Sequence, residues 1–269
     1  MPLTSPDRPP DPVRQLSLFG AEAADPSVAD LAGLLAGPGE MVRMGGTARL
    51  SVVVDAAWRV HVLVAELARC GLAATWEATA DQQHLVRTSY ASTLAPLALA
   101  WLRDPPAPAR AAPDPPAPAR AAPDPPAPDP PAPDPPALGP PALGPPALGP
   151  PALGPAAGGP AAGGPVSGGP VKRPPAGFHL NGRRLRLWVA AAGKSDPPGF
   201  LLRLGVDDEA CREPVGAALA AVGLPAALLD AEAGGPAYRI TGRRRLARLA
   251  DLIGDPPSTA PSLAWPLHP

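Results

Sequence analysis

The chain has 269 residues and a formal net charge of −1, and it contains 46 prolines and 28 glycines. Because so much proline and glycine cannot build a hydrophobic core, composition is informative only segment by segment. The sequence shows no basic start followed by an apolar run, and no stretch of roughly 18 apolar residues that could span a membrane. Two cysteines and four scattered histidines give neither a disulfide framework nor a zinc site. We therefore expect a cytoplasmic protein that uses no membrane, metal or cofactor.

Residues 1–27 are predicted to be a disordered tail with one short motif, Gln15-Leu16-Ser17-Leu18-Phe19, preceded by several prolines that favour extended chain. This pentapeptide resembles the motif with which many bacterial replication and repair proteins bind the β sliding clamp. The resemblance implies that the Gln15 side chain hydrogen-bonds at the edge of a pocket while Leu16, Leu18 and Phe19 fill an apolar cleft. The alternative is that these apolar side chains fold back onto the segment that follows.

Residues 28–103 predict a helix, a hairpin, a helix, a hairpin and a last helix. Glycines mark the ends of several of these elements, at Gly37, at the Gly45-Gly46 turn and at Gly71. The expected elements are a helix from Ser27 or Asp30 to about Ala36, strands Met41–Met44 and Ala48–Val54, a helix from about Ala56 to Cys70, strands Thr75–Thr79 and His84–Ser89, and a helix through Leu94, Leu97 and Trp101.

Residues 104–175 are slipped short repeats rich in proline, alanine and glycine. Asp-Pro-Pro-Ala-Pro-Ala-Arg-Ala-Ala-Pro occurs twice, and Ala-Leu-Gly-Pro-Pro units follow. Proline removes backbone donors and prevents both helix and sheet ladders, so the segment is predicted to be a disordered linker with polyproline II character. Either simple repeat expansion or recognition by a proline-binding module would account for it.

Residues 176–255 predict a second series of elements, followed by a disordered tail over 256–269. The strand that should precede Phe200 would have to fit into Lys194–Gly199, where two prolines argue against it. The other expected elements are a helix Arg183–Ala192, a strand Phe200–Val206, a helix Glu209–Val222, a hairpin Ala227–Thr241 turning at Gly234-Gly235, and a helix Arg243–Ile253.

The two predicted segments resemble each other when one is shifted onto the other by 152 positions. Over the 47 positions from Asp55 to Trp101, which need no gap, twelve residues are identical, against about five expected for so Ala- and Leu-rich a background. Arg87 then aligns with Arg239, and Gly71-Leu72 aligns with Gly223-Leu224. The shift indicates an internal duplication, so we expect an α+β fold of two tandem αββαββα halves.

This order of elements, given twice, resembles the LAGLIDADG homing-endonuclease fold, and residues 31–39 read Leu-Ala-Gly-Leu-Leu-Ala-Gly-Pro-Gly. The resemblance implies that the first helices of the halves pack together and that their sheets form a pseudo-twofold saddle over DNA. Residues 190–200 and 249–254 are more specifically similar to the second half of WhiA-type sporulation regulators. Those regulators continue into a helix-turn-helix that this sequence does not show, so promoter-specific binding of their kind is not expected.

In the nucleases of this family, a carboxylate at the end of each first helix holds a metal ion that activates water. The matching positions here are Pro38 and Ala192, neither of which can bind a cation. Glu40 and Asp196 lie nearby but out of register with each other. We therefore expect a protein that is not an enzyme, with a relic nuclease that uses a shifted metal site as one alternative.

The net charge of the two folded segments does not by itself indicate DNA binding. Lys and Arg number 11 against 9 Asp and Glu in residues 176–255, and 6 against 6 in residues 28–103. DNA contact is therefore predicted from where the arginines lie. Strand arginines can bind phosphate or guanine, or can simply cover the solvent face of a sheet. The three arginines that open the last helix oppose its dipole, so they indicate either a bound anion or a solvated helix face. The predicted DNA-binding residues are Arg43, Arg49, Arg87, Arg203, Arg239, Arg243, Arg244 and Arg245.

Four tryptophans are predicted to pack in the core rather than to stack on bases, because apolar residues accompany them: Trp58, Trp76, Trp101 and Trp188. The sequence as a whole then predicts a non-catalytic, nucleoid-associated DNA-binding protein that docks on the sliding clamp. The alternative to clamp docking is a WhiA-like transcriptional regulator that acts through protein partners.

Overall fold

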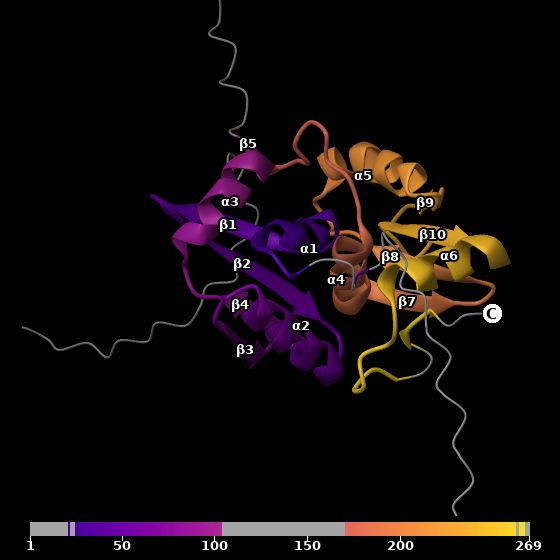
Figure 1. The fold of residues 1–269 in the computed structure, drawn as a ribbon, viewed down its shortest axis with the longest axis horizontal. Coiled ribbons are helices and arrows are strands. Elements are labelled where there is room, and N and C mark those ends of the chain that lie inside the picture. The colour runs from indigo at the N-terminus through magenta and orange to yellow at the C-terminus, as the bar shows by residue number, and fades with distance from the viewer. Residues whose placement is uncertain (1–20, 22–24, 104–169, 262–263, 267–269) are drawn as a thin grey trace, which may run out of the picture. The chain divides into compact units, whose positions relative to one another are not determined.

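The computed structural model describes residues 21, 25–103, 170–261 and 264–266, which belong to one compact unit of antiparallel sheets and α-helices (Figure 1). The mixed α/β class expected from the sequence is therefore confirmed. The pentapeptide at residues 15–19 and most of the Pro-rich segment lie outside the described residues. Within the described ranges, no helix is both long enough and apolar enough to cross a membrane.

The first series of elements follows the predicted order, and glycine forms the first hairpin turn as expected, with Gly45 at a φ of +57°. The opening helix begins as a 3₁₀ turn, in which the Asp30 carboxylate accepts hydrogen bonds from the backbone N–H and the hydroxyl of Ser27. The elements are η1 (Val28–Leu31), α1 (Ala32–Ala36), β1 (Glu40–Met44), β2 (Thr47–Val54), α2 (Ala57–Arg69), β3 (Ala74–Ala78), β4 (His84–Thr88), η2 (Ser92–Leu94), α3 (Ala95–Trp101) and β5 (Leu102–Arg103).

The second series begins at β6, and its first helix is capped by Asn181, whose side-chain oxygen accepts the Arg184 N–H at 2.9 Å. All the predicted elements are present, and their bounds differ from the predicted ones by only a few residues. They are β6 (Val171–Lys172), α4 (Gly182–Ala192), β7 (Gly193–Asp196), β8 (Gly199–Arg203), α5 (Glu209–Ala221), β9 (Ala227–Leu229), β10 (Ala237–Thr241) and α6 (Arg243–Ile253). Two segments predicted to be disordered also contain ordered residues: Val171 and Lys172 of the predicted linker form β6, and Trp265 of the predicted tail is buried, with its indole N–H donating to the Gly254 carbonyl oxygen at 3.1 Å.

Strand β7 shows that the argument against a strand before Phe200 was wrong. The strand starts at Gly193, directly at the end of α4, and pairs with β8 from Gly193↔Leu202 to Asp196↔Gly199. Pro197 and Pro198 lie between the two strands, in the turn, where their missing N–H groups cost no ladder hydrogen bond. The prolines therefore limit the length of the hairpin without preventing it.

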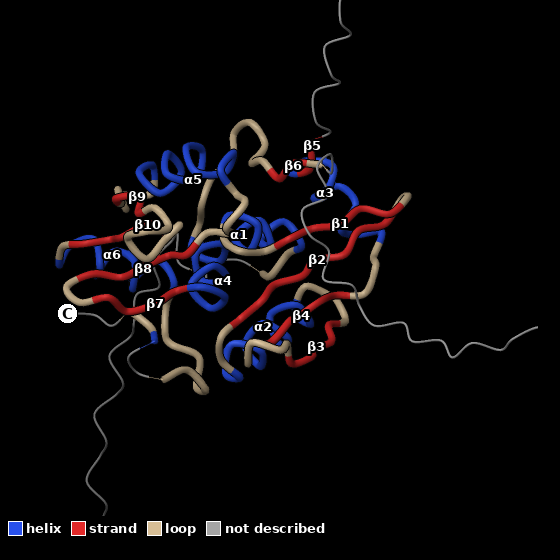
Figure 2. The backbone as a smooth tube through the Cα atoms, turned by 180° about the vertical axis from the view of Figure 1, so that it is seen from behind, coloured by secondary structure: helices blue, strands red, loops and turns tan. Residues whose placement is uncertain are grey.

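The two four-stranded sheets have matching strand orders, β1-β2-β4-β3 and β7-β8-β10-β9, and every neighbouring pair is antiparallel. The bounds of α2 and α5 differ by the same 152 residues as the sequence alignment. Helices pack against one side of each sheet, and Figure 2 shows the strands in front of α2, α4 and α6. One face of each sheet is therefore buried and the other is open.

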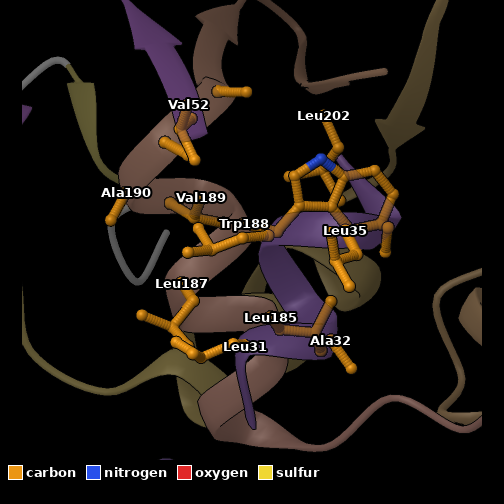
Figure 3. Close-up of a cluster of buried hydrophobic side chains, with 14 of the residues drawn as sticks. Leu31, Ala32, Leu35, Val52, Leu185, Leu187, Trp188, Val189, Ala190 and Leu202 are labelled. Atoms are coloured by element: carbon orange, nitrogen blue, oxygen red, sulfur yellow. The ribbon is translucent and has the colours of Figure 1, made fainter. Parts of the chain in front are cut away.

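Helices α1 and α4 pack directly against each other and join the two sheets into one core (Figure 3). Gly33 makes this close approach possible, because an added Cβ would lie 2.0 Å from the backbone oxygen of Arg184. An added Cβ at Gly37 would lie 2.4 Å from the indole ring of Trp188. Leu35, Leu185 and Trp188 are fully buried at this contact.

The tryptophan prediction is confirmed for Trp101 and Trp188, which are buried, and Trp58 packs partly against the core. It is wrong for Trp76, whose side chain is 53% exposed. Trp76 lies on the edge strand β3, where it meets the His84 ring edge-on. An edge strand has no neighbour on one side to complete a pocket for so large a ring.

Candidate nucleic-acid interface

The open faces of the two sheets carry alternate residues of each strand. In β2, Ala48, Leu50, Val52 and Val54 are buried under the helices, so the residues between them point to the open side. Register extends this assignment across both sheets, because directly paired residues point the same way. We call these surfaces the first open face (β1, β2, β4 and β3) and the second open face (β7, β8, β10 and β9).

A cavity of about 400 Å³ lies where the two open faces meet. Val53 and Glu40 of the first open face line it together with Lys194 and Arg203 of the second. The residues at the ends of α1 and α4, Pro38 on one side and Ala191 to Gly193 on the other, form another part of its wall. The cavity therefore sits at the C-terminal ends of the paired helices.

Arg59 of α2 neutralises the C-terminal end of α4. Its guanidinium donates to the backbone oxygens of Val189 at 3.1 Å, Ala190 at 2.9 Å and Gly193, and its Nε pairs with Asp55 at 2.8 Å. Burial lowers the pKa of Arg59, and the Asp55 carboxylate opposes that shift. A cation at a helix C-terminus is favourable because unpaired carbonyls and the helix dipole place negative charge there.

Lys172 of β6 does the same for α1. Its ammonium group donates to the backbone oxygens of Gly37 at 2.9 Å and Gly39 at 2.8 Å and forms a buried ion pair with Asp208. The residue 152 positions after Arg59 is Cys211, too short to reach a helix end, and its Sγ lies 3.5 Å from the Lys172 carbonyl oxygen. The two helix ends are thus neutralised alike, by cations from different elements.

These cations bear on the shifted-nuclease alternative. Glu40 lines the cavity, but Asp196 pairs instead with Arg239 at 2.8 Å on the second open face. Among the described residues, no group of three or more His, Cys, Asp and Glu side chains is placed to hold a metal ion. At the C-terminal ends of α1 and α4, the backbone carbonyl oxygens of Gly37 and Ala190 already accept hydrogen bonds from Lys172 and Arg59.

The second open face carries a cluster of cations around Leu201. Lys194 and Arg239 are the direct neighbours of Leu201 on β7 and β10, and Arg203 follows two positions along β8 on the same side. Leu201 is only 8% exposed although it points to the open side, as expected where long basic side chains lie over an apolar residue. We call Lys194, Arg203 and Arg239 the basic cluster.

Lys194 was not among the predicted DNA-binding residues, because its segment was not expected to form a strand. The segment Gly193–Asp196 has no alternation of apolar and polar residues, and the only local signal for a hairpin is the Pro-Pro pair before the apolar strand at Phe200. On the second open face, Asp196 is the carboxylate beside the three cations of the basic cluster, and it pairs with Arg239. The wall of the adjoining cavity also carries carboxylates: Glu40, Asp55, Asp207 and Asp208.

The first open face holds its arginines differently. The guanidinium of Arg49 lies 4.9 Å from the centre of the Tyr90 ring, and Arg87 forms an ion pair with Glu77. Arg43, paired with Ala48, points to the helix side of the sheet, although its side chain is exposed. Arg49 and Arg87 thus share a face with each other, and Arg43 does not join them.

The remaining predicted residues lie in the helix layer. Arg243, Arg244 and Arg245 open α6 and are exposed, and Arg245 donates to the Thr241 carbonyl oxygen at 3.3 Å. The last half of α6 packs into the core through Leu249, Leu252 and Ile253, so its basic residues lie on a surface separate from the open faces. The structure therefore divides the predicted arginine set among four surfaces: the two open faces, the helix side of the first sheet, where Arg43 lies, and the start of α6.

The predicted clamp-binding residues Gln15 to Phe19 lie outside the described part of the chain. Comparison with known proteins finds no matching family model, no matching curated protein and no matching solved structure.

Proposed function

We propose that this chain is a DNA-associated protein without chemistry of its own, built from two copies of one αββαββα unit in a pseudo-twofold arrangement. The matching strand orders and the 152-residue spacing of α2 and α5 support the duplication. The observation that carries the DNA proposal is the basic cluster, since three cations share one open face beside the cavity. Backbone phosphates are the ligand that such a surface fits.

The basic cluster also sets the expected strength of binding. Arg239 pairs with Asp196, so Lys194 and Arg203 remain to neutralise about two phosphates. The salt slope is then about −1.8, and the affinity falls about 12-fold between 50 and 200 mM salt. The DNA contact is therefore modest and salt-sensitive. A second attachment point would raise the effective concentration of DNA at the open faces.

The pentapeptide Gln15 to Phe19 provides this second attachment point. In this proposal Gln15 to Phe19 bind the β sliding clamp, and the folded unit contacts DNA close to the clamp. The test is capture of the full chain on immobilised clamp. Leu18→Ala with Phe19→Ala should abolish capture, while Leu3→Ala with Val13→Ala, which removes two apolar side chains outside the motif, should leave it intact. Equal capture of both variants would exclude docking through this peptide.

The absence of catalysis is proposed from the C-terminal ends of α1 and α4, where carbonyl oxygens already accept hydrogen bonds from Lys172 and Arg59. A nicking assay on supercoiled plasmid with Mg²⁺ or Mn²⁺ tests it. Metal-dependent nicking that is lost on Glu40→Gln would show a working metal site and overturn the non-catalytic assignment.

DNA binding itself is tested by fluorescence anisotropy on a duplex with a single-stranded overhang, so that the result does not depend on strandedness. Lys194→Gln with Arg203→Gln should weaken binding by tenfold or more and reduce the salt slope by about 2. The matched control is Arg244→Gln with Arg248→Gln, which removes the same charge from α6. Equal losses in the two variants would assign DNA to general surface charge rather than to the second open face.

A further inference from the structure

The two open faces differ in chemistry. Where the second open face carries the basic cluster, the first exposes large apolar side chains: Met44 is 60% exposed, Val42 is 44% exposed and Val53 is 43% exposed. Register places all three on the open side, since Val42 pairs with Arg49, Met44 with Thr47 and Val53 with Leu85. Val42 and Met44 are neighbours on this face of β1, while the Glu40–Ser51 pair lies between them and Val53.

An aromatic ring adjoins this apolar surface. Tyr90 is 36% exposed, and Arg49 of β2 lies against its ring at 4.9 Å. Arg49 is the direct strand neighbour of Val42, so its guanidinium lies between that side chain and the Tyr90 ring. We call Val42, Met44, Val53 and Tyr90 the apolar platform.

The apolar platform does not fit double-stranded DNA. A duplex turns its charged phosphates outward and offers its base edges as hydrogen-bond donors and acceptors. On the first open face the two arginines already have partners, Arg49 on the Tyr90 ring and Arg87 with Glu77. Phosphates laid over Met44 and Val42 would lose hydration without gaining partners.

Single-stranded DNA is chemically complementary to the two open faces. Its unpaired base faces are apolar and stack on aromatic rings and guanidinium planes, while its phosphates bind cations. One DNA strand can contact both the apolar platform and the basic cluster, because Val53 of the platform lines the same cavity as Lys194 and Arg203 of the cluster. The eight residues of β2 span about 23 Å at ~3.3 Å per residue, which is room for a few nucleotides.

We propose that the open faces bind single-stranded DNA, with phosphates on the basic cluster and unpaired bases on the apolar platform. This inference rests on the proposed DNA-binding function and specifies its substrate. In this proposal the first sheet binds bases and the second binds phosphates. Substitutions in the apolar platform should therefore weaken the binding of single-stranded DNA and leave the binding of duplex DNA unchanged.

The test is anisotropy titration of the full chain with a labelled 20-nucleotide single strand and with the blunt duplex of the same sequence. We expect the single strand to bind at least tenfold tighter at low salt. Val42→Ser with Met44→Ser should weaken single-strand binding about tenfold and change duplex binding less than twofold. The matched control is Leu99→Ser with Val171→Ser, which alters two exposed apolar residues away from the open faces and should change neither. Thermal unfolding confirms that each variant is folded.

Each outcome separates this inference from the one on which it rests. Equal or tighter duplex binding, or an unchanged single-strand affinity in the platform variant, overturns the single-strand inference and leaves DNA binding in place. Lack of binding to either form at low salt overturns the DNA proposal itself. If light scattering shows a dimer that the platform variant converts to a monomer, the platform is a self-association surface and the inference is wrong.

Discussion

Replacing Arg59 by methionine removes the cation that holds the end of α4 while retaining most of the apolar stem. Arg59 is 5% exposed and its guanidinium donates to three backbone oxygens of the second series of elements. Hydrogen bonds to a charged group contribute about 1.5–3 kcal/mol each, and a cation at a helix C-terminus contributes up to about 2 kcal/mol. The sum overstates the loss, because water from the adjoining cavity can reach the carbonyls in the variant.

We therefore expect Arg59→Met to lower the free energy of unfolding by about 2–4 kcal/mol, a large share of the roughly 5–15 kcal/mol of an ordinary domain. For a folded unit of this size, the loss corresponds to a Tm decrease of roughly 4–16 °C. Lys172→Met should cost more, because its partner Asp208 has a side chain only 11% exposed and would be left as a buried charge. The Asp55 side chain, at 52% exposed, stays hydrated without Arg59.

Urea and thermal unfolding followed by circular dichroism measure both effects. Arg43→Met is the control, since it removes an exposed strand arginine and should stay within about 0.5 kcal/mol of the unmodified protein. The reasoning fails if Arg59→Met unfolds within about 1 kcal/mol of the unmodified protein, or if Lys172→Met is the milder of the two.

Three further predictions concern packing, topology and thiol chemistry. Gly33→Ala should destabilise by more than about 2 kcal/mol in thermal unfolding because backbone blocks the added methyl, whereas Gly46→Ala, with open space around it, should be nearly neutral. Strands β5 and β6 pair, so a two-residue Asn-Gly turn can replace residues 104–170. The circular dichroism spectrum should stay unchanged, and the shorter loop should raise the free energy of unfolding by about 2–3 kcal/mol because less entropy is lost on closing it. Loss of the folded spectrum would contradict this. Burial raises the pKa of Cys211 to about 11, so below pH 9 its thiolate is about a hundredfold scarcer than that of an ordinary thiol and should resist a thiol reagent until the protein unfolds. Burial also raises the pKa of Cys70, but its side chain is partly exposed, so Cys70 should react first.

The raised pKa of Cys211 also fixes the direction of a pH effect on stability. Its protonated form is favoured in the folded state, so the associated stability is fully present below the ordinary thiol pKa and is lost as pH rises toward about 11. Cys211→Ser should remove this alkaline dependence in urea unfolding curves recorded at several pH values.

The order of helices and strands was predictable because local signals specify it. Alternation of apolar residues in β2, helical spacing in α2 and the glycines at Gly45 and Gly71 each depend on neighbours a few residues away. Strand β7 was missed because the prolines were placed inside it, when they form its turn. Trp76 was misplaced because its sequence neighbours do not reveal that β3 is an edge strand.

The sequence alone determined the class of the fold, the repeated series of elements and the absence of carboxylates at Pro38 and Ala192. Only the tertiary structure decided which charged residues act together. Arg43 and Arg49 lie six residues apart on neighbouring strands yet point to opposite faces, while Arg59 reaches carbonyls 130 residues away. The physical reason is that side-chain direction follows strand register, and the ends of α1 and α4 receive their cations from segments distant in sequence, to which no local pattern points.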